Sequence, residues 1–501
     1  MSAAAEPRHL DEIAAWSLAG PRDEPAIAWR GQRFERGWVA DTAKSVVDAI
    51  AATGASADMT AGFIPRSRPE AAAAFMGMLA ARRSMTMIYS YQSVDAMAGD
   101  LRKLRTAVLV AHEEDWQEPL VAAAREVGAA GVSLAADGRA LLVPGLERVT
   151  GTDHRLAPAD PSIELLTSGT SGPPKRHPIS FGQFQRCMLE SSFKLGDGEG
   201  DRRPALITVP LANISGIYGF IVGFAGRRMI IMEEKFTLPI WLDHVKTYRP
   251  MNIAGPPAMV KMILDADIAP EDLSSARFLT MGMGPVDPII RRTFEARYGI
   301  PILPCYGATE FVGSATAMTM DDHLKYGEAK FGSVGRAVSN VTLRIRDSES
   351  GEVLPADDET IGIVEVLHDG LGPEWIRTTD LGRLDADGFL YLHGRADGVI
   401  IRGGFKIHPS AIESVLMQHP GVAACAVVGV PHERLGHVPV AAIEAQPKGE
   451  APTAGELDMW LRKHLPATNI PADYRIVAEL PRTPSLKIRI DAVRDLFAES
   501  A

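Results

Sequence analysis

Short apolar segments alternate with stretches of helical periodicity along most of this chain. Strands are expected where β-branched and other apolar residues cluster, at residues 163–166, 205–209, 229–232, 277–281 and 302–305. Helices are expected at 256–264, at 286–298 and behind Ser180, an N-cap after which Phe181, Phe184 and Met188 recur at helical spacing. This strand-then-helix rhythm is typical of an α/β fold, with mostly parallel sheets covered by helices on both faces.

The pattern changes after Gly394, where a compact α+β unit of about 100 residues is expected, a normal size for a small domain. Its expected strands are 399–402, 423–430, 438–445 and 474–478, and its expected helices are 410–418 and 455–464. We therefore expect a large multi-sheet N-terminal domain over 1–394, a hinge over 395–397 and a small C-terminal domain over 398–501.

Composition narrows the class of protein. A hydrophobic fraction of 46% and a charged fraction of 23% are values of folded chains and exclude wholesale disorder. The net charge of -11 argues against a nucleic-acid-binding protein, because phosphate binding needs a concentrated basic surface. Cys187, Cys305 and Cys425 lie far apart, which favours reduced thiols. No apolar stretch reaches the ~18 residues of a spanning helix, and residues 1–10 lack a signal core, so we expect a cytoplasmic monomer or homodimer.

A glycine-rich segment at 166–175 reads Leu-Thr-Ser-Gly-Thr-Ser-Gly-Pro-Pro-Lys and follows an expected strand. Its backbone N–H groups and hydroxyls suit phosphate oxygens, and Lys175 adds a cation. The spacing of the P-loop of kinases and GTPases is absent. We expect a helix to follow this phosphate loop, whose candidate binding residues are Thr167, Ser168, Gly169, Thr170, Ser171, Gly172 and Lys175.

Four more segments follow in a fixed order. They are Tyr-Gly-Ala-Thr-Glu at 306–310, Arg-Thr-Thr-Asp-Leu-Gly at 377–382, Gly-Arg-Ala-Asp at 394–397 running into 403–407, and Pro-Arg-Thr-Pro-Ser-Leu-Lys-Ile at 481–488. With the phosphate loop, they closely resemble the adenylate-forming superfamily: acyl-CoA synthetases, peptide-synthetase adenylation domains and firefly luciferase. The resemblance extends from about Glu24 to the C-terminus.

The resemblance implies an active site between a large domain and a small mobile one, and a reaction in two halves. A carboxylate attacks the α-phosphate of Mg-ATP, giving an acyl-adenylate and pyrophosphate, and a thiol such as that of coenzyme A then displaces AMP. Adenylation supplies the leaving group that a carboxylate lacks.

The resemblance also assigns roles on the nucleotide side. The phosphate loop would hold the β- and γ-phosphates, and Tyr306 would stack on adenine, with Gly307 and Gly282 beside it. Thr309 would contact the α-phosphate, and Glu310 would coordinate Mg²⁺, a cation that prefers carboxylate and phosphate oxygens. A core tyrosine and a solvated glutamate are the alternative interpretations, which the motif context disfavours.

Three further residues complete the predicted chemistry. Asp380 and Arg395 would bind the ribose, although a turn aspartate and a surface ion pair are the plainer alternatives. Lys487 would catalyse the first half-reaction, because a positioned cation offsets the negative charge that gathers as a carboxylate meets a phosphate. For the second half-reaction, the small domain would rotate about Asp397, and Gly403 and Gly404 would line the thiol tunnel.

Four positions depart from the family pattern. Arg176 follows Lys175 where glycine is usual, and it is expected either to contact phosphate or to point to solvent. Asn213 stands where many acyl-CoA synthetases carry a histidine beside the acyl carboxylate; asparagine keeps a hydrogen-bonding role but cannot titrate. Thr379 and Leu486 each replace a glycine, before Asp380 and Lys487. No departure removes a phosphate-binding, ribose-binding or catalytic group.

The expected acyl pocket carries no charged side chain. Its candidate lining residues are Asn213, Ile214, Ser215, Tyr218, Met281, Gly282, Met283, Gly284, Cys305 and Gly307. An amino-acid substrate would need an acid to pair with its ammonium group, so we expect an apolar carboxylic acid, with room for a bulky or ring-containing one. Plain core packing of the methionines stays an alternative.

An AMP-forming carboxylic acid–CoA ligase that uses ATP, Mg²⁺ and coenzyme A is therefore the leading hypothesis. An acyl-AMP ligase that loads a carrier protein is the second, although no carrier domain follows Ala501 and no segment blocking a CoA tunnel is evident. A non-catalytic acyl or nucleotide sensor is the third. The joint presence of Glu310, Asp380 and Lys487 counts against it.

Overall fold

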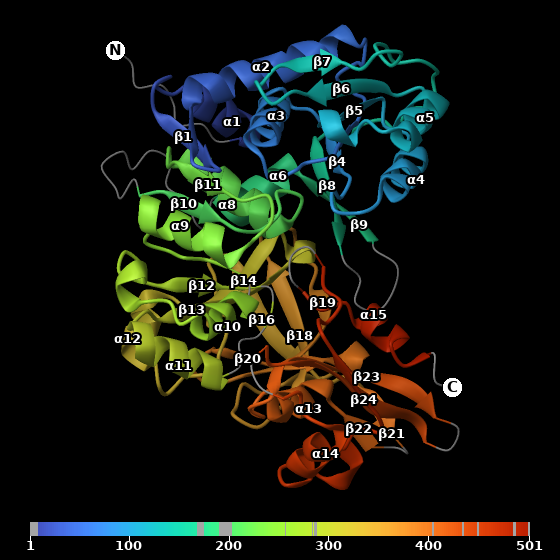
Figure 1. Ribbon diagram of the computed structural model, residues 1–501. Helices are drawn as coiled ribbons and strands as arrows, with labels where there is room; N and C mark the ends of the chain where they lie inside the picture. The colour runs from blue at the N-terminus through green and yellow to red at the C-terminus, as the bar shows by residue number, and fades with distance from the viewer. Residues whose placement is uncertain are drawn as a thin grey trace.

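The computed structural model describes residues 9–167, 175–189, 203–255, 257–282, 284, 288–402, 405–432, 435–447, 450–483 and 487–498. Within these ranges the strands form five sheets, four in the large N-terminal part and one in the small C-terminal part. Figure 1 shows the C-terminal part, in orange and red, below the blue and teal sheet that begins the chain. None of the described helices is long and apolar enough to cross a membrane.

The largest sheet has the order β7-β6-β5-β3-β4-β8-β9. Its members are β3 (Ala61–Phe63), β4 (Met85–Met87), β5 (Val108–His112), β6 (Ala130–Leu134), β7 (Ala140–Leu142), β8 (Ser162–Thr167) and β9 (Lys175–Ser180). The five inner strands run parallel, and the edge strands β7 and β9 are antiparallel. Such a sheet needs helices on both faces, as expected from the sequence.

Alternating residues of β5 show how both faces are covered. Val108 and Val110 join the core formed with α1 (Leu10–Leu18), α2 (Arg36–Ala52) and α3 (Pro69–Ala80), whereas Leu109 and Ala111 join the core under α4 (Val94–Leu104) and α5 (Glu118–Val127). Successive strand residues face opposite sides, so a parallel strand covered twice is apolar throughout. Helix α3 is buried along nearly its whole length because its alanines let neighbouring helices approach closely.

Two further sheets continue the α/β rhythm. One has the order β10 (Ala205–Ile207), β11 (Ile230–Met232), β1 (Pro25–Trp29), β2 (Gln32–Glu35) and is accompanied by α8 (Ile214–Ala225) and α9 (Leu238–Tyr248). The other has the order β12 (Leu279–Met281), β13 (Ile302–Ala308), β14 (Gly313–Ala317), β15 (Arg336–Ala337) and is accompanied by α10 (Pro257–Asp265), α11 (Pro288–Tyr298) and α12 (Met320–Tyr326). The strands and helices expected in this region are present, most of them shorter by a few residues.

The fourth sheet corrects the expectation of mostly parallel strands. Its order is β17 (Val353–Leu354), β16 (Val341–Arg346), β18 (Gly362–His368), β19 (Ile376–Leu384), β20 (Leu390–Arg395), and every pair in it is antiparallel. Antiparallel strands need only tight turns, whereas parallel strands need long crossovers. The turns here contain Gly351 and Gly388 at φ values of 73° and 81°, which the missing side chain permits.

The C-terminal part is the α+β unit expected from the sequence. Its sheet contains β21 (Ile400–Arg402), β22 (Phe405–Ile407), β23 (Val422–His432), β24 (Gly436–Ala445) and β25 (Tyr474–Val477), and its helices are α13 (Pro409–Leu416), α14 (Ala454–Arg462) and α15 (Ile490–Asp495). The sequence did not predict β22 or α15, whose segments are too short for a clear periodicity. Helices α13 and α14 share one apolar core with this sheet, and Val493 and Phe497 join a second.

Candidate active site

Tyr306 and Asp380 meet between two sheets. Tyr306 lies on β13 and is 8% exposed, and its Oη donates a hydrogen bond of 2.6 Å to Oδ2 of Asp380 on β19. Burial and the charge of Asp380 both raise the pKa of Tyr306, so its hydroxyl stays a protonated donor. A motif tyrosine and a motif aspartate 74 residues apart are thus brought into direct contact.

Arg395 lies beside Asp380 because β19 and β20 pair at this position. Its Nη1 is 3.7 Å from Oδ1 of Asp380, and both side chains keep exposed surface. The Oγ1 of Thr378 accepts a hydrogen bond of 3.0 Å from the Asp380 backbone N–H, which fixes the strand there. The carboxylate and guanidinium therefore form a partly exposed polar edge next to Tyr306, as the predicted ribose contact requires.

The end of β13 turns sharply. Thr309 and Glu310 lie in a 3-10 turn over Thr309–Phe311, and Glu310 is exposed. Gly307 admits no side chain, because a Cβ there would lie 2.2 Å from the carbonyl oxygen of Gly313 on the neighbouring strand. The close approach of β13 and β14 therefore fixes the position of Thr309 and Glu310 at the end of β13.

Lys487 reaches the same region from the C-terminal part. Its backbone N–H donates a hydrogen bond of 3.1 Å to Oγ1 of Thr483, and its carbonyl accepts one of 2.7 Å from the Thr483 N–H. Although Lys487 keeps exposed surface, loss of hydration and the charge of Arg395 lower its pKa, while Glu310 acts in the opposite direction. Lys487, Arg395 and Glu310 therefore share one electrostatic environment across both parts of the chain.

The donors available for Mg²⁺ are few. Among the described residues, no group of three or more His, Cys, Asp or Glu side chains is placed to hold a metal ion. One exposed carboxylate, that of Glu310, is a suitable partner for an ion that keeps several waters and takes most other ligands from nucleotide phosphates. The residues present fit nucleotide-bound Mg²⁺.

The phosphate loop connects β8 and β9. Thr167 and Lys175 are directly paired at the ends of these antiparallel strands, and Lys175 is exposed. Ser168, Gly169, Thr170, Ser171 and Gly172 lie outside the described residues.

A strand that the sequence did not predict, β9, lies between this loop and the helix expected after it. Pro178 is tolerated in β9 because β9 is an edge strand. The predicted N-cap Ser180 begins α6 (Phe181–Phe184) with a capping box to Gln183. A π-helical turn over Gln185–Leu189 continues α6.

One of the two expectations for Arg176, that it points to solvent, is wrong. Its Nη1 donates a hydrogen bond of 2.9 Å to the carbonyl of Met87, and its Nη2 lies 3.1 Å from Oδ2 of Asp100. The side chain is 18% exposed. Arg176 therefore connects β9 to β4 and α4, and its guanidinium hydrogen-bonds groups of the protein itself.

The acyl side centres on Asn213, which precedes α8. Its side chain lies near the hydroxyl of Tyr89, just after β4, and acts against the burial that raises the pKa of that phenol; the hydrogen-bonding role expected of Asn213 toward the acid stays a prediction. The sequence analysis did not single out Tyr89, because no motif surrounds it and only its place after an apolar strand could have drawn attention. Gly282, which directly follows β12, lies close to Cys305 on β13, since a Cβ at Gly282 would lie 3.0 Å from Cys305 Sγ. Burial raises the pKa of Cys305 to about 11.

The other predicted acyl residues are spread more widely. Ile214 and Tyr218 pack against the large core, and Tyr218 lines a small apolar gap with Phe184, Met188 and Leu10. Ser215 and Gly284 are exposed. Met283 lies outside the described residues. In the structure, Asn213 lies near Tyr89 and Gly282 lies close to Cys305. Part of the Tyr218 ring packs against the large core.

The predicted hinge and thiol tunnel are only partly described. Asp397 lies in a 3-10 turn over Ala396–Gly398, between β20 and β21. Thr379 is exposed on β19. Gly403, Gly404 and Leu486 lie outside the described residues, so their roles and the division at 395–397 stay predictions.

Comparison with known proteins gives this arrangement a family. A model of the AMP-binding enzymes matches residues 14–371, and one of the AMP-binding enzyme C-terminal domain matches residues 411–487. The chain belongs to the AMP-binding enzyme family. The resemblance found in the motifs is confirmed, together with the enzyme class that it implied, an AMP-forming acid–thiol ligase that uses ATP and coenzyme A.

Several relatives are acid ligases by name. An indoleacetate–CoA ligase of Aromatoleum aromaticum is 30% identical over 364 residues, covering 69% of each chain. A 2-succinylbenzoate–CoA ligase of Bacillus subtilis is 28% identical, covering 66% of this chain and 68% of its own. A fatty acid–acyl-carrier-protein ligase of Streptomyces coeruleorubidus is 27% identical, covering 69% of each chain.

Solved structures confirm the fold class. ATP-bound MatB from Rhodopseudomonas palustris superposes with a TM-score of 0.82 at 22% identity, covering 97% of this chain and 99% of its own. The o-succinylbenzoate CoA synthetase of Bacillus subtilis, bound to its acyl-adenylate intermediate, gives a TM-score of 0.79 at 21% identity and covers 98% of both chains.

Proposed function

We propose that this enzyme activates an apolar, ring-containing carboxylic acid with ATP and transfers the acyl group to coenzyme A. The observation that carries the proposal is that Lys487 lies near enough to Arg395 and Glu310 for their charges to act on its pKa, although the three residues come from separate segments of the chain. A small domain delivering a lysine to the nucleotide side of a large domain suits the first half-reaction.

Each residue then has a chemical task in adenylation. Asp380, held between Tyr306 and Arg395, accepts hydrogen bonds from ribose hydroxyls, as carboxylates commonly do in nucleotide sites. Lys487 stabilises the charge that gathers when the carboxylate attacks the α-phosphate, and one such donor typically accounts for a factor of about 10²–10³ in rate. Glu310 would hold Mg²⁺, which neutralises charge on the phosphate oxygens.

The second half-reaction needs a second arrangement of the small domain. A rotation about the turn that contains Asp397 would withdraw Lys487 and bring Gly403 and Gly404 to the thiol path. A bulky side chain at Gly403 should therefore slow thioester formation and leave adenylation intact.

The choice of an apolar acid rests on the acyl side. Asn213, Tyr89, Gly282 and Cys305 carry no formal charge there, so a second charged group on the acid would lack a counter-ion among them. Indoleacetate and 2-succinylbenzoate, the acids of two relatives, both contain an aromatic ring. A sulfoacetate–CoA ligase of Cupriavidus necator, 31% identical, makes small anionic acids the class to test against.

The acceptor is the second question. Most of the relatives named here use coenzyme A, and the carrier-protein ligase among them makes a carrier protein the competing acceptor. A cytoplasmic location and a monomeric or homodimeric state remain predictions from the sequence.

Release of AMP and pyrophosphate tests the proposal, measured over a panel of aromatic, alicyclic, aliphatic and sulfonated acids with and without coenzyme A. We expect AMP release with a ring-containing acid that depends on coenzyme A and gives a thioester. Pyrophosphate without thioester would favour a carrier protein as acceptor. No turnover with any acid would contradict the proposal and favour the sensor.

A further inference from the structure

Arg176 stands at the point where the phosphate loop rejoins the sheet. The antiparallel strands β8 and β9 pair Thr167 with Lys175 at the two ends of this loop, and Leu166 with Arg176 one step further in. Among the described strands, β9 pairs with β8 alone, because it forms the edge of the sheet. The path of the chain out of the loop therefore depends on one strand pairing and on side chains of β9 that reach other elements.

The Arg176 side chain reaches across β8. Its Nη1 donates a hydrogen bond of 2.9 Å to the carbonyl of Met87, the last residue of β4, and its Nη2 donates one of 3.1 Å to Oδ2 of Asp100 on α4. Since the strand order is β4-β8-β9, these bonds connect the edge strand to the strand beyond its neighbour. The side chains of Arg176 and Asp100 are 18% and 21% exposed, and a pair buried to this extent is screened less than a surface pair.

The two carboxylates beside Arg176 are themselves held. Oδ2 of Asp100 also accepts a hydrogen bond of 3.1 Å from Nε2 of Gln92, in the segment between β4 and α4. Glu164 on β8 places Oε2 4.0 Å from Arg176 Nη1. Its two oxygens accept hydrogen bonds of 2.7 and 2.8 Å from Arg155. The guanidinium therefore lies between two carboxylates that each have a second partner, which favours one fixed geometry.

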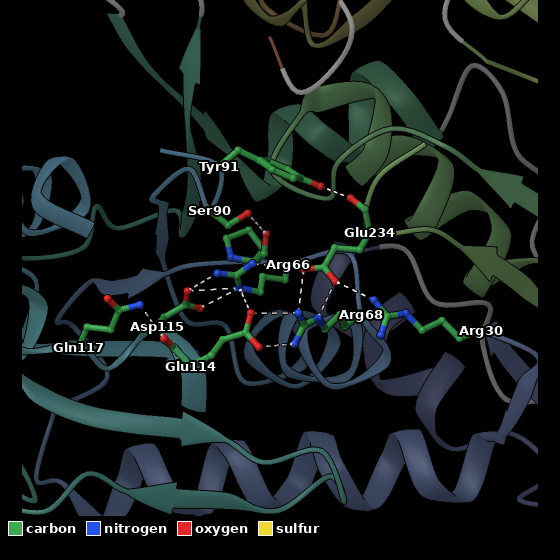
Figure 2. Close-up of polar contacts among 10 residues, drawn as sticks. Arg30, Arg66, Arg68, Ser90, Tyr91, Glu114, Asp115, Gln117 and Glu234 are labelled. Carbon is green, nitrogen blue, oxygen red and sulfur yellow. Dashed lines mark hydrogen bonds and ion pairs between the residues drawn. The ribbon is translucent and has the colours of Figure 1, made fainter. Parts of the chain in front are cut away.

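A second arginine of similar burial provides a comparison. Figure 2 shows Arg66 and Arg68, which follow β3, on either side of the Glu234 carboxylate, at 3.2 and 2.9 Å. Arg68 is 19% exposed and also pairs with Glu114, so it matches Arg176 in burial and in bonding to carboxylates. These ion pairs join the segments that follow β3, β5 and β11, and none of those segments contains the phosphate loop.

We propose that Arg176 is a positioning residue for the first half-reaction, whose guanidinium, held by Asp100 and the Met87 carbonyl, fixes β9 where the phosphate loop ends at Lys175. This inference rests on the proposed function, in which that loop holds the β- and γ-phosphates of ATP. Glycine, the usual residue at position 176, has no side chain to make these bonds. Because the two phosphates leave as pyrophosphate, Arg176 serves adenylation and not the transfer to coenzyme A.

Arg176→Ala is the test and Arg68→Ala its matched control. A hydrogen bond between charged groups corresponds to a factor of roughly ten or more in an equilibrium constant. We expect Arg176→Ala to raise KM for ATP, and KM for pyrophosphate in the reverse reaction, about tenfold and to leave KM for the acid unchanged. Conversion of supplied acyl-adenylate and coenzyme A to thioester should continue at the wild-type rate.

Arg68→Ala should lower the unfolding temperature and leave KM for ATP as in the wild type. An equal rise of KM for ATP in Arg68→Ala and Arg176→Ala would overturn the inference, because both changes would then act through a general loss of structure. Equal damage to both half-reactions in Arg176→Ala would overturn it as well.

Changes at Asp100 cover the case in which Arg176→Ala disturbs folding, and they test whether Arg176 contacts a phosphate directly. Asp100→Ala should raise KM for ATP, and Asp100→Asn, which keeps an acceptor, should raise it less. The double variant of Arg176→Ala with Asp100→Ala should raise it no more than the more damaging single change. An unchanged or lower KM for ATP in Asp100→Ala would show that Arg176 acts without Asp100 and would contradict the inference.

Wild-type pyrophosphate exchange separates the two proposals. Its absence with every acid refutes the proposed function, whereas its presence together with unaltered kinetics of Arg176→Ala refutes only the role of Arg176.

Discussion

The two sides of the site are built differently. The nucleotide side uses residues that stand in recognisable motifs, such as Tyr306, Asp380 and Lys487, and their side chains touch or share one electrostatic environment. On the acyl side, Asn213 at the start of α8 lies near Tyr89, a residue in no motif that follows β4. All members of the family bind ATP, so the residues that contact it recur in the same motifs. The acid differs between members, so it is bound by a pocket of suitable shape and by uncharged hydrogen-bond donors.

Loss of Lys487 should have the largest effect on the nucleotide side. Lys487→Ala is expected to slow adenylation by about 10²–10³-fold, because the developing charge loses its cation. Thioester formation from supplied acyl-adenylate and coenzyme A should continue at close to the wild-type rate. Quench-flow measurement of each half-reaction checks this, with the exposed Lys463→Ala as control. Equal loss of both halves would break the assignment of Lys487 to one conformation.

Loss of Asp380 should weaken ATP binding while sparing the acid. Asp380→Ala leaves the buried Tyr306 hydroxyl without its acceptor and Arg395 without its carboxylate, so KM for ATP should rise about tenfold or more. Initial-rate kinetics with each substrate varied in turn provide the measurement. Asp358→Ala is the matched control, since that carboxylate is exposed and pairs only with Arg383 among the contacts found for it.

Loss of the Asn213 amide should have a smaller effect and on the other side. Asn213→Ala removes an uncharged hydrogen-bonding amide from the acyl side, and one neutral hydrogen bond corresponds to a factor of about 2–10. We expect KM for the acid to rise by that factor and KM for ATP to stay unchanged. A shift in ATP affinity instead would erase the distinction between the two sides.

Glu413 lies outside both the nucleotide side and the acyl side of the site, so its replacement should change the stability of the fold and leave substrate binding unaltered. It lies on α13, where Oε1 accepts a hydrogen bond of 2.8 Å from the Val427 N–H, and burial raises its pKa to about 7. The unfolded chain releases this proton near pH 4, so stability should fall as pH rises from about 4 to 7 and then level off. Glu413→Gln should flatten that slope in thermal unfolding at a series of pH values and leave both KM values unchanged.

Most of the fold could be predicted from local patterns of apolar residues in the sequence. Each expected strand of the C-terminal part is present within a few residues, because continuous apolar runs such as those within 422–432 and 436–445 mark these strands in the sequence itself. The edge strand β9 was not predicted, since its pairing with β8 determines its conformation and Pro178 argues against a strand in the sequence. The antiparallel order of the fourth sheet likewise depends on pairing, which periodicity does not encode.

The site divides in the same way. Motif spacing pointed to Tyr306 and Asp380 before their hydrogen bond was known. It could not reveal that Tyr89 lies near Asn213, nor the pairing of Arg176 with Asp100, more than 70 residues away in sequence. Contacts between distant segments are decided by packing, and a single sequence carries no direct sign of them.

The most direct test of the two-sided site is a crossed measurement of KM for ATP and KM for the acid in Asp380→Ala and Asn213→Ala. The account predicts that each variant raises the KM of one substrate only, ATP for Asp380→Ala and the acid for Asn213→Ala. A parallel rise of both KM values in both variants would contradict it, because the two residues would then act through a shared structural defect.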